Sequence, residues 1–169
     1  AADPFVCVEV DPEALEGSNI TVLCVGHSSD TALIDARQTP GLGEVLASKH
    51  LLGAYQAKAT HRALFRTFGI GPERWACVML VEQLISGGRR TDLELSTLAQ
   101  RYLGKALPDA SEGLAAIRLR TRGVADLLQK QIEQIMRDIE KVQGPLHDQE
   151  ALYERAYEEW EQQNEVEEG

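Results

Sequence analysis

The order of short segments along the chain constrains its fold more than any other feature. Three short β-branched segments come first, and the turn-like stretches "EGSN" and "HSSD" separate them: "FVCVEV" (5–10), "ITVLCVG" (20–26) and "TALIDA" (31–36). Three strands with such tight connections predict an antiparallel meander. From "TPGLGEVLAS" onward the pattern changes to alternating strands and helices. This order predicts an α/β fold, a mixed sheet with helices packed on it.

Periodicity and glycines predict the later elements. We expect a short helix over 40–49, a strand over 51–56, a helix over 57–70 that ends at Gly69, and a helix, or a strand turning into one, over 76–85. A further helix is expected over 92–104, with a glycine C-cap and apolar positions at Leu95, Leu98, Ala99 and Tyr102. After "KALPDASEG" the chain looks helical through Val142.

The C-terminal region has two apolar stripes. The first runs at spacings of 4, 3, 4 and 3, a narrow seam of coiled-coil type: Leu128, Ile132, Ile135, Ile139 and Val142. "QGPL" (143–146) predicts a break, followed by a second helix with the stripe Leu152, Tyr153, Ala156, Tyr157 and Trp160. We therefore expect a domain over 1–128 and an acidic helical hairpin or extension over 129–169. The stripes predict a surface for a protein partner or for self-association, with packing on the chain's own core as the alternative.

The net charge of -10 is unevenly distributed. Residues 129–169 carry four Lys/Arg against twelve Asp/Glu, whereas residues 1–128 carry thirteen against fifteen. In the nearly neutral part, basic residues gather in "GGRR", at Arg101 and Lys105, and in "RLRTR" (118–122). This clustering permits a local phosphate-binding surface, and a solvated helix face is the alternative. The acidic tail favours a protein partner at that end.

The sequence gives few signs of membrane targeting or of disulfides. No apolar run approaches the roughly 18 residues that span a membrane, and the start, "AADPFVCVEV", lacks the pattern of a signal peptide. We expect an intracellular protein, cytoplasmic or organellar, without membrane contact. Cys7, Cys24 and Cys77 are odd in number, and two lie in apolar strand-like runs, so we expect buried free thiols.

Three longer stretches of the sequence resemble known motifs, and they occur in a fixed order along the chain. "VEVDPEAL" (8–15) resembles a strand that carries Asp-x-Glu, "LLGAYQAKATHRALFRTFGI" (51–70) resembles a segment with "H-N-A-K-F-D", and "VMLVEQLISGGRRTDLELSTLAQRYLG" (78–104) resembles a helix, a Gly/Arg loop and "L-x-x-L-A-x-R-Y-L-G". Over roughly residues 5–130 the set resembles the 3′–5′ exonuclease domain of bacterial family-A DNA polymerases, and more broadly the ribonuclease D-like group of DEDD exonucleases. The resemblance implies a ribonuclease H-like mixed sheet.

The resemblance also assigns residues to the chemistry of this family, in which four carboxylates hold two divalent cations that activate a water. Asp11 and Glu13 match the first motif, and a strand would put both side chains on one face. Thr60 stands at the third carboxylate; in the Tyr-x-x-x-Asp motif, Leu114 stands at the Tyr and Arg118 at the Asp. A hydroxyl cannot replace a carboxylate on a hard cation. The resemblance therefore implies vestigial Asp11 and Glu13, no catalytic residues, no metal and no cofactor.

Pro12 makes the first motif irregular, because a proline removes a ladder donor from a strand. Asp11, Pro12 and Glu13 are therefore open to a second interpretation, a strand end or turn whose carboxylates diverge.

The sequence leads to a catalytically inactive exonuclease-like domain that serves as a nucleic-acid-associated binding module or a protein-interaction scaffold. The alternative is an active 3′–5′ exonuclease that uses Asp11 and Glu13 with an unconventional third ligand, and a fortuitous likeness is the third interpretation. Arg118, Arg120 and Arg122 would flank the family's substrate groove and bind single-stranded DNA or RNA weakly. In a competing interpretation, Arg118 closes the site through a salt bridge to Asp11 or Glu13.

Overall fold

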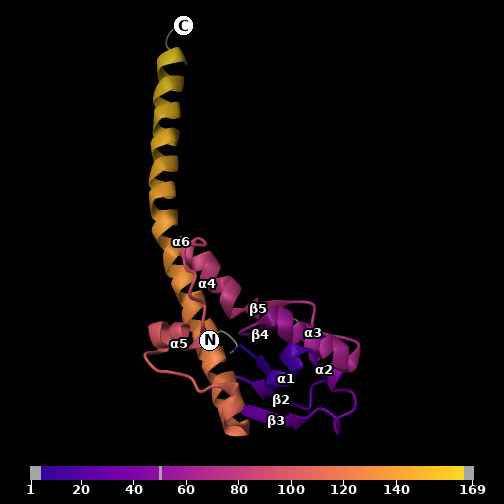
Figure 1. Cartoon of the computed structure of the whole chain (residues 1–169). Helices are drawn as coiled ribbons and strands as arrows, with labels where there is room; N and C mark the ends of the chain where they lie inside the picture. The colour runs from indigo at the N-terminus through magenta and orange to yellow at the C-terminus, as the bar shows by residue number, and fades with distance from the viewer. Residues whose placement is uncertain (1–4, 50, 166–169) are drawn as a thin grey trace. The chain divides into compact units, whose positions relative to one another are not determined.

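The computed structural model describes residues 5–49 and 51–165, and the chain divides into two units, Ala1–Ile132 and Glu133–Gly169. The first unit contains a five-stranded sheet in the order β3-β2-β1-β4-β5 (Figure 1). Its strands are β1 (Cys7–Val10), β2 (Val22–Gly26), β3 (Thr31–Asp35), β4 (Leu52–Ala54) and β5 (Trp75–Cys77). The first three strands pair antiparallel, whereas β4 is parallel to both β1 and β5. The predicted meander and mixed sheet are confirmed.

Apart from α1, which was not predicted, the helices follow the expected order. They are α1 (Pro12–Glu16), α2 (Leu42–Ala47), α3 (Ala57–Phe68), α4 (Val78–Ser86), α5 (Leu95–Leu103) and α6 (Leu114–Glu165), with a 3-10 turn η1 (Ala110–Glu112) before α6. The stretch 76–85 is a strand turning into a helix, since β5 leads directly into α4. Gly69 caps α3 in the left-handed conformation, with a φ of 76°, as expected from the sequence.

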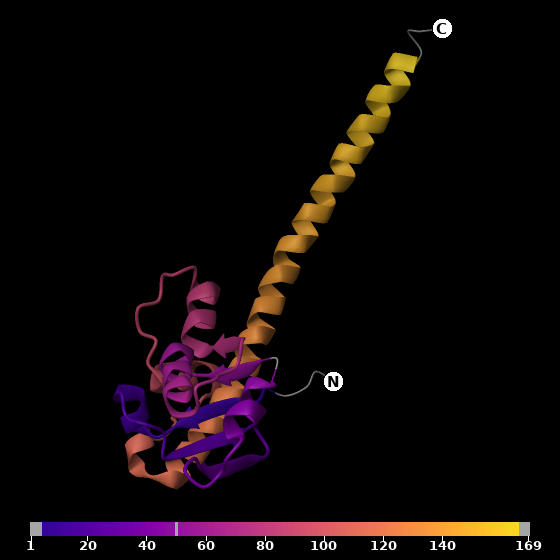
Figure 2. The ribbon, with the colours of Figure 1, turned by 90° about the vertical axis from the view of Figure 1, so that its right-hand side faces the viewer.

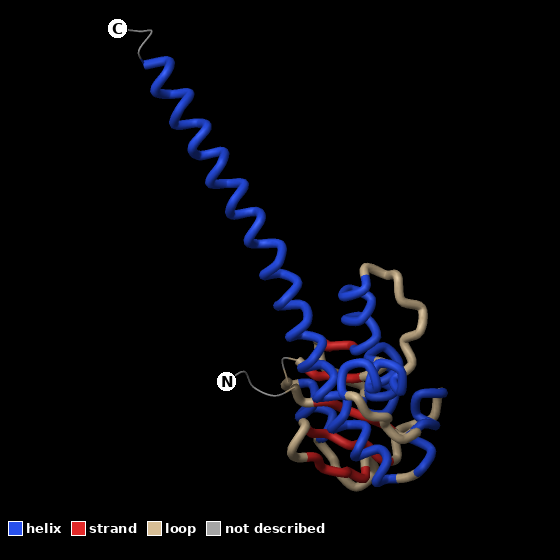
Figure 3. The backbone as a smooth tube through the Cα atoms, turned by 90° about the vertical axis from the view of Figure 1, so that its left-hand side faces the viewer, coloured by secondary structure: helices blue, strands red, loops and turns tan. Residues whose placement is uncertain are grey.

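The sheet lies between two apolar layers, because side chains alternate along each strand. On one side, Val8 and Val10 of β1 pack with residues of α1, α2 and α3. On the other side, Cys7 packs with residues of α4, α5 and the first part of α6. Figure 3 traces the strands in red and the surrounding helices in blue. Glu9, between Val8 and Val10, therefore belongs to the side of the sheet covered by α6.

Two glycines allow the first part of α6 to pack closely. A Cβ on Gly53 of β4 would lie 2.6 Å from Cys7 Sγ and 2.6 Å from Leu128 Cδ1. A Cβ on Gly123 of α6 would lie 2.4 Å from Leu107 Cδ2, in the connection after α5. Neither position can hold a side chain unless its neighbours move, so these glycines set how closely α6 approaches β4 and that connection.

The C-terminal residues do not form the predicted hairpin. The helix α6 continues from Leu114 to Glu165 with Pro145 inside it (Figure 2). The break predicted over 143–146 is wrong, because α6 continues through Gly144 and Pro145, where the proline removes one backbone hydrogen bond without ending the helix. The boundary between the two units falls after Ile132, four residues beyond the predicted boundary at 128. The ends of the two predicted domains, residues 1–4 and 166–169, lie outside the described residues.

The sequence also led us to expect no membrane-spanning helix and three free, buried cysteines. Within residues 5–49 and 51–165, no helix combines the length and apolar character needed to cross a membrane. Cys7, Cys24 and Cys77 are free and buried, as predicted. Burial, with a smaller contribution from Glu9, raises the pKa of the Cys7 thiol to about 12.

Candidate functional site

The carboxylates of the first motif lie where β1 ends and α1 begins. Asp11 directly follows the strand, and Pro12 is the first residue of α1, so Glu13 belongs to the helix. Asp11 is buried, whereas Glu13 is exposed. The expectation that Asp11 and Glu13 share one face of a strand is wrong, because a proline at the first helical position favours a helix start there. The acidic residue within β1 is Glu9.

The carboxylate of Asp11 holds backbone groups. One of its oxygens, Oδ1, accepts hydrogen bonds from the amides of Thr21 and Val22, at 3.0 and 3.2 Å. The Asp11 amide donates in turn to the Val22 carbonyl oxygen at 3.1 Å. Asp11 therefore fastens the start of β2 to the end of β1.

Glu9 forms an ion pair with α6. Arg120 Nε donates to Glu9 Oε1 at 2.8 Å, and the two side chains are only 15% and 8% exposed. A second nitrogen of Arg120 donates to the carbonyl oxygen of Pro108 at 3.1 Å. Burial raises the pKa of Glu9, and the charge and hydrogen bond of Arg120 offset that rise only in part. The carboxylate of β1 thus faces a guanidinium.

The three arginines of "RLRTR" do not share one face of α6. Residues four apart on a helix lie on the same face, so Arg118 and Arg122 are neighbours, whereas Arg120, two residues from each, points elsewhere. The Nε atoms of Arg118 and Arg122 are buried without a hydrogen-bond partner among the described residues. The arginine that pairs with a β1 carboxylate is Arg120, rather than Arg118 as the alignment suggests.

The other two motif positions hold neutral side chains. Thr60 lies in α3, only 4% exposed, and its hydroxyl donates to the Gln56 carbonyl oxygen at 2.9 Å. Leu114 is the first residue of α6 and is exposed. Neither side chain supplies a charged oxygen.

Two divalent cations need several carboxylate oxygens that face one another. Glu9 is paired with Arg120, and Asp11 accepts two amides. Within residues 5–49 and 51–165, no group of three or more His, Cys, Asp or Glu side chains could hold a metal ion. The residues at the motif positions therefore do not fit a two-cation site.

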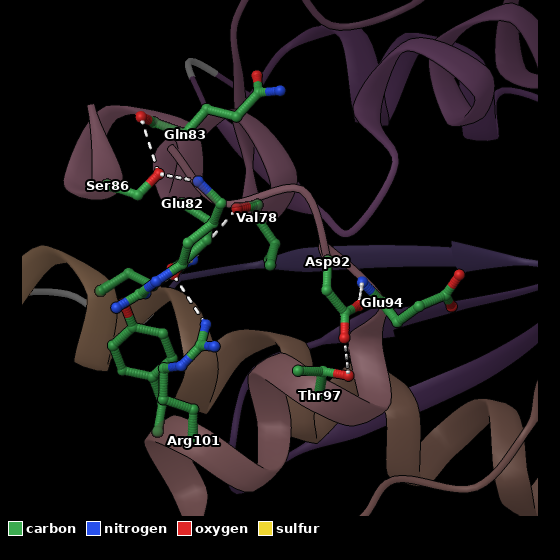
Figure 4. Close-up of polar contacts among 11 residues, drawn as sticks. Val78, Glu82, Gln83, Ser86, Asp92, Glu94, Thr97 and Arg101 are labelled. Atoms are coloured by element: carbon green, nitrogen blue, oxygen red, sulfur yellow. Dashed lines mark hydrogen bonds and ion pairs between the residues drawn. The ribbon is translucent and has the colours of Figure 1, made fainter. Parts of the chain in front are cut away.

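A third buried carboxylate, Glu82 of α4, lies outside the family's carboxylate positions. Its side chain is fully buried and accepts hydrogen bonds from four side chains, Arg90, Arg101, Tyr102 and Gln131. Figure 4 shows Glu82 with Arg101. The Tyr102 hydroxyl lies 2.7 Å and the Gln131 amide nitrogen 3.1 Å from Glu82 Oε2. Burial alone would raise the pKa of Glu82, but the hydrogen bonds from Tyr102, Gln131 and Arg90 outweigh it and hold the pKa below its usual value.

The Glu82 cluster joins α4, the loop after it, α5 and α6. The sequence contained one signal for it, a single acid in the apolar run "CVMLVEQLI" followed by the paired arginines of "GGRR". Because a lone buried acid needs a cationic partner, that pattern favours an internal ion pair.

A cavity of about 380 Å³ lies between α3 and α4. Lys58 and Arg62, four residues apart on α3, contribute two cations to its wall, and Met79 and Leu80 of α4 contribute apolar surface. No motif in the sequence marks these residues.

No family model and no curated protein matches the sequence. Among solved structures, Brucella melitensis NrnC is similar with a TM-score of 0.65 and 13% identity, covering 83% of this chain and 77% of that chain. An apo form of a nuclease gives a TM-score of 0.64 and 14% identity, over 80% of this chain and 75% of that one. The POL domain of Pol1 from M. smegmatis, in complex with DNA primer-template and dNTP, gives 0.59 and 24% identity, over 79% of this chain and 24% of that chain. These likenesses confirm an exonuclease-like, ribonuclease H-like fold.

Proposed function

We propose that this chain is a catalytically inactive exonuclease-like domain that serves as a binding module and a protein-interaction scaffold. The observation that carries the proposal is the ion pair between Arg120 and Glu9. A guanidinium and a divalent cation would compete for the same carboxylate, and Arg120 is tethered beside it. Displacing Arg120 would leave a cation without its partner in a largely buried place, which is strongly unfavourable.

Two further contacts support inactivity. Asp11 uses one carboxylate oxygen to hold the amides of Thr21 and Val22, and the Thr60 hydroxyl donates within its own helix. Asp11 Oδ1 and the Thr60 hydroxyl therefore already make hydrogen bonds within the fold and are not free to bind a cation.

The alternative, an active exonuclease that uses Asp11 and Glu13, has less support. Such an enzyme needs both carboxylates on one cation, but Asp11 ends a strand and Glu13 lies exposed in the first turn of α1. Its third ligand would also have to come from outside the motif positions.

Weak binding of single-stranded DNA or RNA is part of the proposal. A structure similar to this chain, NrnC, has been solved bound to pGG. We assign the contact to Arg118 and Arg122, because Arg120 already binds Glu9 and the Pro108 carbonyl oxygen. Binding of this kind weakens steeply with salt, since phosphate contacts release counterions.

A nuclease assay with designed variants tests the inactive assignment. The parent chain should not shorten a 3′-labelled oligonucleotide with Mg²⁺ or Mn²⁺. The double variant Thr60→Asp/Arg120→Asp should bind Mn²⁺ more tightly than the parent, because it removes the guanidinium that pairs with Glu9 and adds two carboxylates, one of them at the position of the family's third carboxylate. Its matched control is Thr60→Asp/Arg118→Asp, which adds the same charges but leaves the Arg120–Glu9 pair intact.

Two results would contradict the proposal. Processive shortening by the parent, abolished by Asp11→Ala, would make the chain an enzyme. Equal Mn²⁺ affinity in the two double variants would mean that Arg120 does not stand at the cation position.

The nucleic-acid contact has a separate test. Arg118→Ala/Arg122→Ala should bind a short single strand more weakly than the parent at low salt, with a shallower dependence of affinity on salt. Arg89→Ala/Lys105→Ala, which removes two cations elsewhere, serves as the control. If both variants lose affinity equally, the binding is diffuse and the assignment to Arg118 and Arg122 fails.

A further inference from the structure

The second unit carries a regular heptad pattern. Ile139, Leu146, Tyr153 and Trp160 follow one another every seven residues, and Val142, Gln149 and Ala156 follow three residues after the first three of them. These are the spacings of the two core rows of a coiled coil. The pattern runs through Pro145 without a change of phase, because α6 continues there as one helix.

Both rows are exposed in this unit. The large side chains range from 43% exposed at Ile139 to 69% at Tyr153. An apolar stripe this long on a helix that is otherwise acidic is suited to another helix.

The two rows differ in size, which bears on how a second helix would pack. One row holds Ile, Leu, Tyr and Trp, while the other holds Val, Gln and Ala. In a parallel pair of identical helices each row meets itself, so Trp160 would meet Trp160 and Ala156 would meet Ala156. In such a parallel pair, the layers with two large side chains are crowded and the layers with two small ones contain voids. In an antiparallel pair, each row meets the other.

One antiparallel register matches three of the four large side chains to the three smaller ones. With the two-fold axis at Ala151, Trp160 lies opposite Val142 of the second copy, Leu146 opposite Ala156, and Tyr153 opposite Gln149. Each layer then combines one large side chain with one smaller one, which is how facing core positions fill space evenly. Glu165, the last residue of α6, lies opposite Arg137, so the pairing stays within the second unit.

The charges of the helix favour the same orientation. Residues 133–147 carry three Asp/Glu and two Lys/Arg. Residues 148–165 carry seven Asp/Glu and one Lys/Arg. A parallel pair would set the two strongly acidic halves side by side. An antiparallel pair sets each acidic half beside a nearly neutral one, which lowers the repulsion between the copies.

From these observations we infer that two copies of this chain associate through residues 137–165 as an antiparallel two-stranded coiled coil centred on Ala151. The inference rests on the scaffold role proposed above and names a second copy as the partner. Single substitutions along the helix distinguish this dimer from binding of a different partner to the same apolar stripe.

The first test is the mass of the full chain in solution over a range of concentrations, measured by light scattering after size exclusion. The parent should be a dimer, and Leu146→Glu should be a monomer at concentrations where the parent is paired. His147→Glu adds the same side chain one position away, outside both rows, and should remain a dimer. A monomeric parent, or equal dimerisation of the two variants, overturns the inference.

The second test is orientation, read by disulfide formation between copies. Leu152→Cys lies beside the proposed axis, so its two thiols should cross-link on oxidation. Val142→Cys should not, because its two copies would lie eighteen residues apart along the helix axis, about 27 Å. The natural cysteines are buried, which keeps their background low. Cross-linking by Val142→Cys but not Leu152→Cys would mean a parallel pair and would overturn the antiparallel arrangement.

These tests do not depend on catalysis. A monomeric chain without nuclease activity would end the coiled-coil inference and leave the inactive assignment standing. A dimeric chain that degrades oligonucleotides would do the reverse.

Discussion

Glu9 and Glu82 are both buried carboxylates paired with arginine, yet their surroundings differ. Glu82 accepts hydrogen bonds from four side chains, which belong to the loop after α4, to α5 and to α6. Its pKa lies below the usual value. Glu9 is paired with Arg120, and its pKa lies above the usual value because burial outweighs that pairing. A buried charge is therefore well accommodated at Glu82 and poorly accommodated at Glu9.

The comparison teaches that an ion pair alone does not make a buried carboxylate stabilising. Several donors must replace the lost water, as Tyr102 and Gln131 do together with the arginines of the Glu82 cluster. The Glu9–Arg120 pair keeps a charge in the sheet at a position where the fold gains little from it. This contrast fits our proposal that Arg120 takes the place of a cation at Glu9.

The largest expected effect comes from removing Glu82. Glu82→Ala should lower the free energy of unfolding by about 3–5 kcal/mol, because Arg90, Arg101, Tyr102 and Gln131 lose their common acceptor. Urea unfolding measures the change, and the exposed Glu140→Ala serves as a control with little effect. A loss below about 1 kcal/mol would show that the cluster does not hold these elements together.

The second effect comes from isolating Glu9. Arg120→Ala should lower the free energy of unfolding by about 2 kcal/mol, since it leaves a buried carboxylate without its cation. Adding Glu9→Gln to this variant removes the charge and should recover most of the loss. If the double variant is as unstable as the single one, the contacts of the Arg120 side chain with Pro108 and its surroundings matter more than the ion pair.

A smaller effect is expected at Tyr102. Tyr102→Phe deletes one of the donors to Glu82 and should lower the free energy of unfolding by about 1.5 kcal/mol, a common value for a hydrogen bond to a charged group. In the Glu82→Ala background the same substitution should have little further effect. Full additivity of the two changes would mean that Tyr102 does not act through Glu82.

The smallest effect is a difference in pH dependence. The raised pKa of Glu9 adds stability below the ordinary carboxyl pKa, and this stability is lost as pH rises through the folded-state value. The lowered pKa of Glu82 adds stability above the ordinary pKa, and it is lost as pH falls through the folded-state value. As pH rises above about 4, the ordinary carboxyl pKa, Glu9→Gln should therefore gain stability relative to the parent. As pH falls below about 4, Glu82→Gln should gain stability relative to the parent, so the two variants depend on pH in opposite directions. Slopes of the same sign would remove the contrast between the two carboxylates.

The sequence predicted the strands and most helices because each depends on local pattern. Alternation in "FVCVEV" and the change of period after residue 40 place the strands within a few residues of β1 to β4. It failed at Pro145, because a Gly-Pro pair is typical of a break, whereas α6 continues through it.

The site depends on contacts between distant residues, which a pattern cannot display. The sequence Asp11-Pro12-Glu13 matches the motif Asp-x-Glu, but Glu13 lies in α1. In the structure, Glu9 lies within β1 and Asp11 directly follows it. Likewise, Arg118 and Arg120 cannot be told apart until the rotation of α6 above the sheet is known. Glu82 was missed because its donors lie 8 to 49 residues away in the sequence.

Arg120 and Gln131 are eleven residues apart on α6, which is about three turns, so both side chains leave the helix on nearly the same side. One binds Glu9 and the other binds Glu82. The segment between them can neither turn nor slide without breaking both contacts. In native-state hydrogen exchange, its amides should accordingly open only when the whole first unit unfolds, whereas the amides of residues 146–163 exchange through local fraying in the monomer.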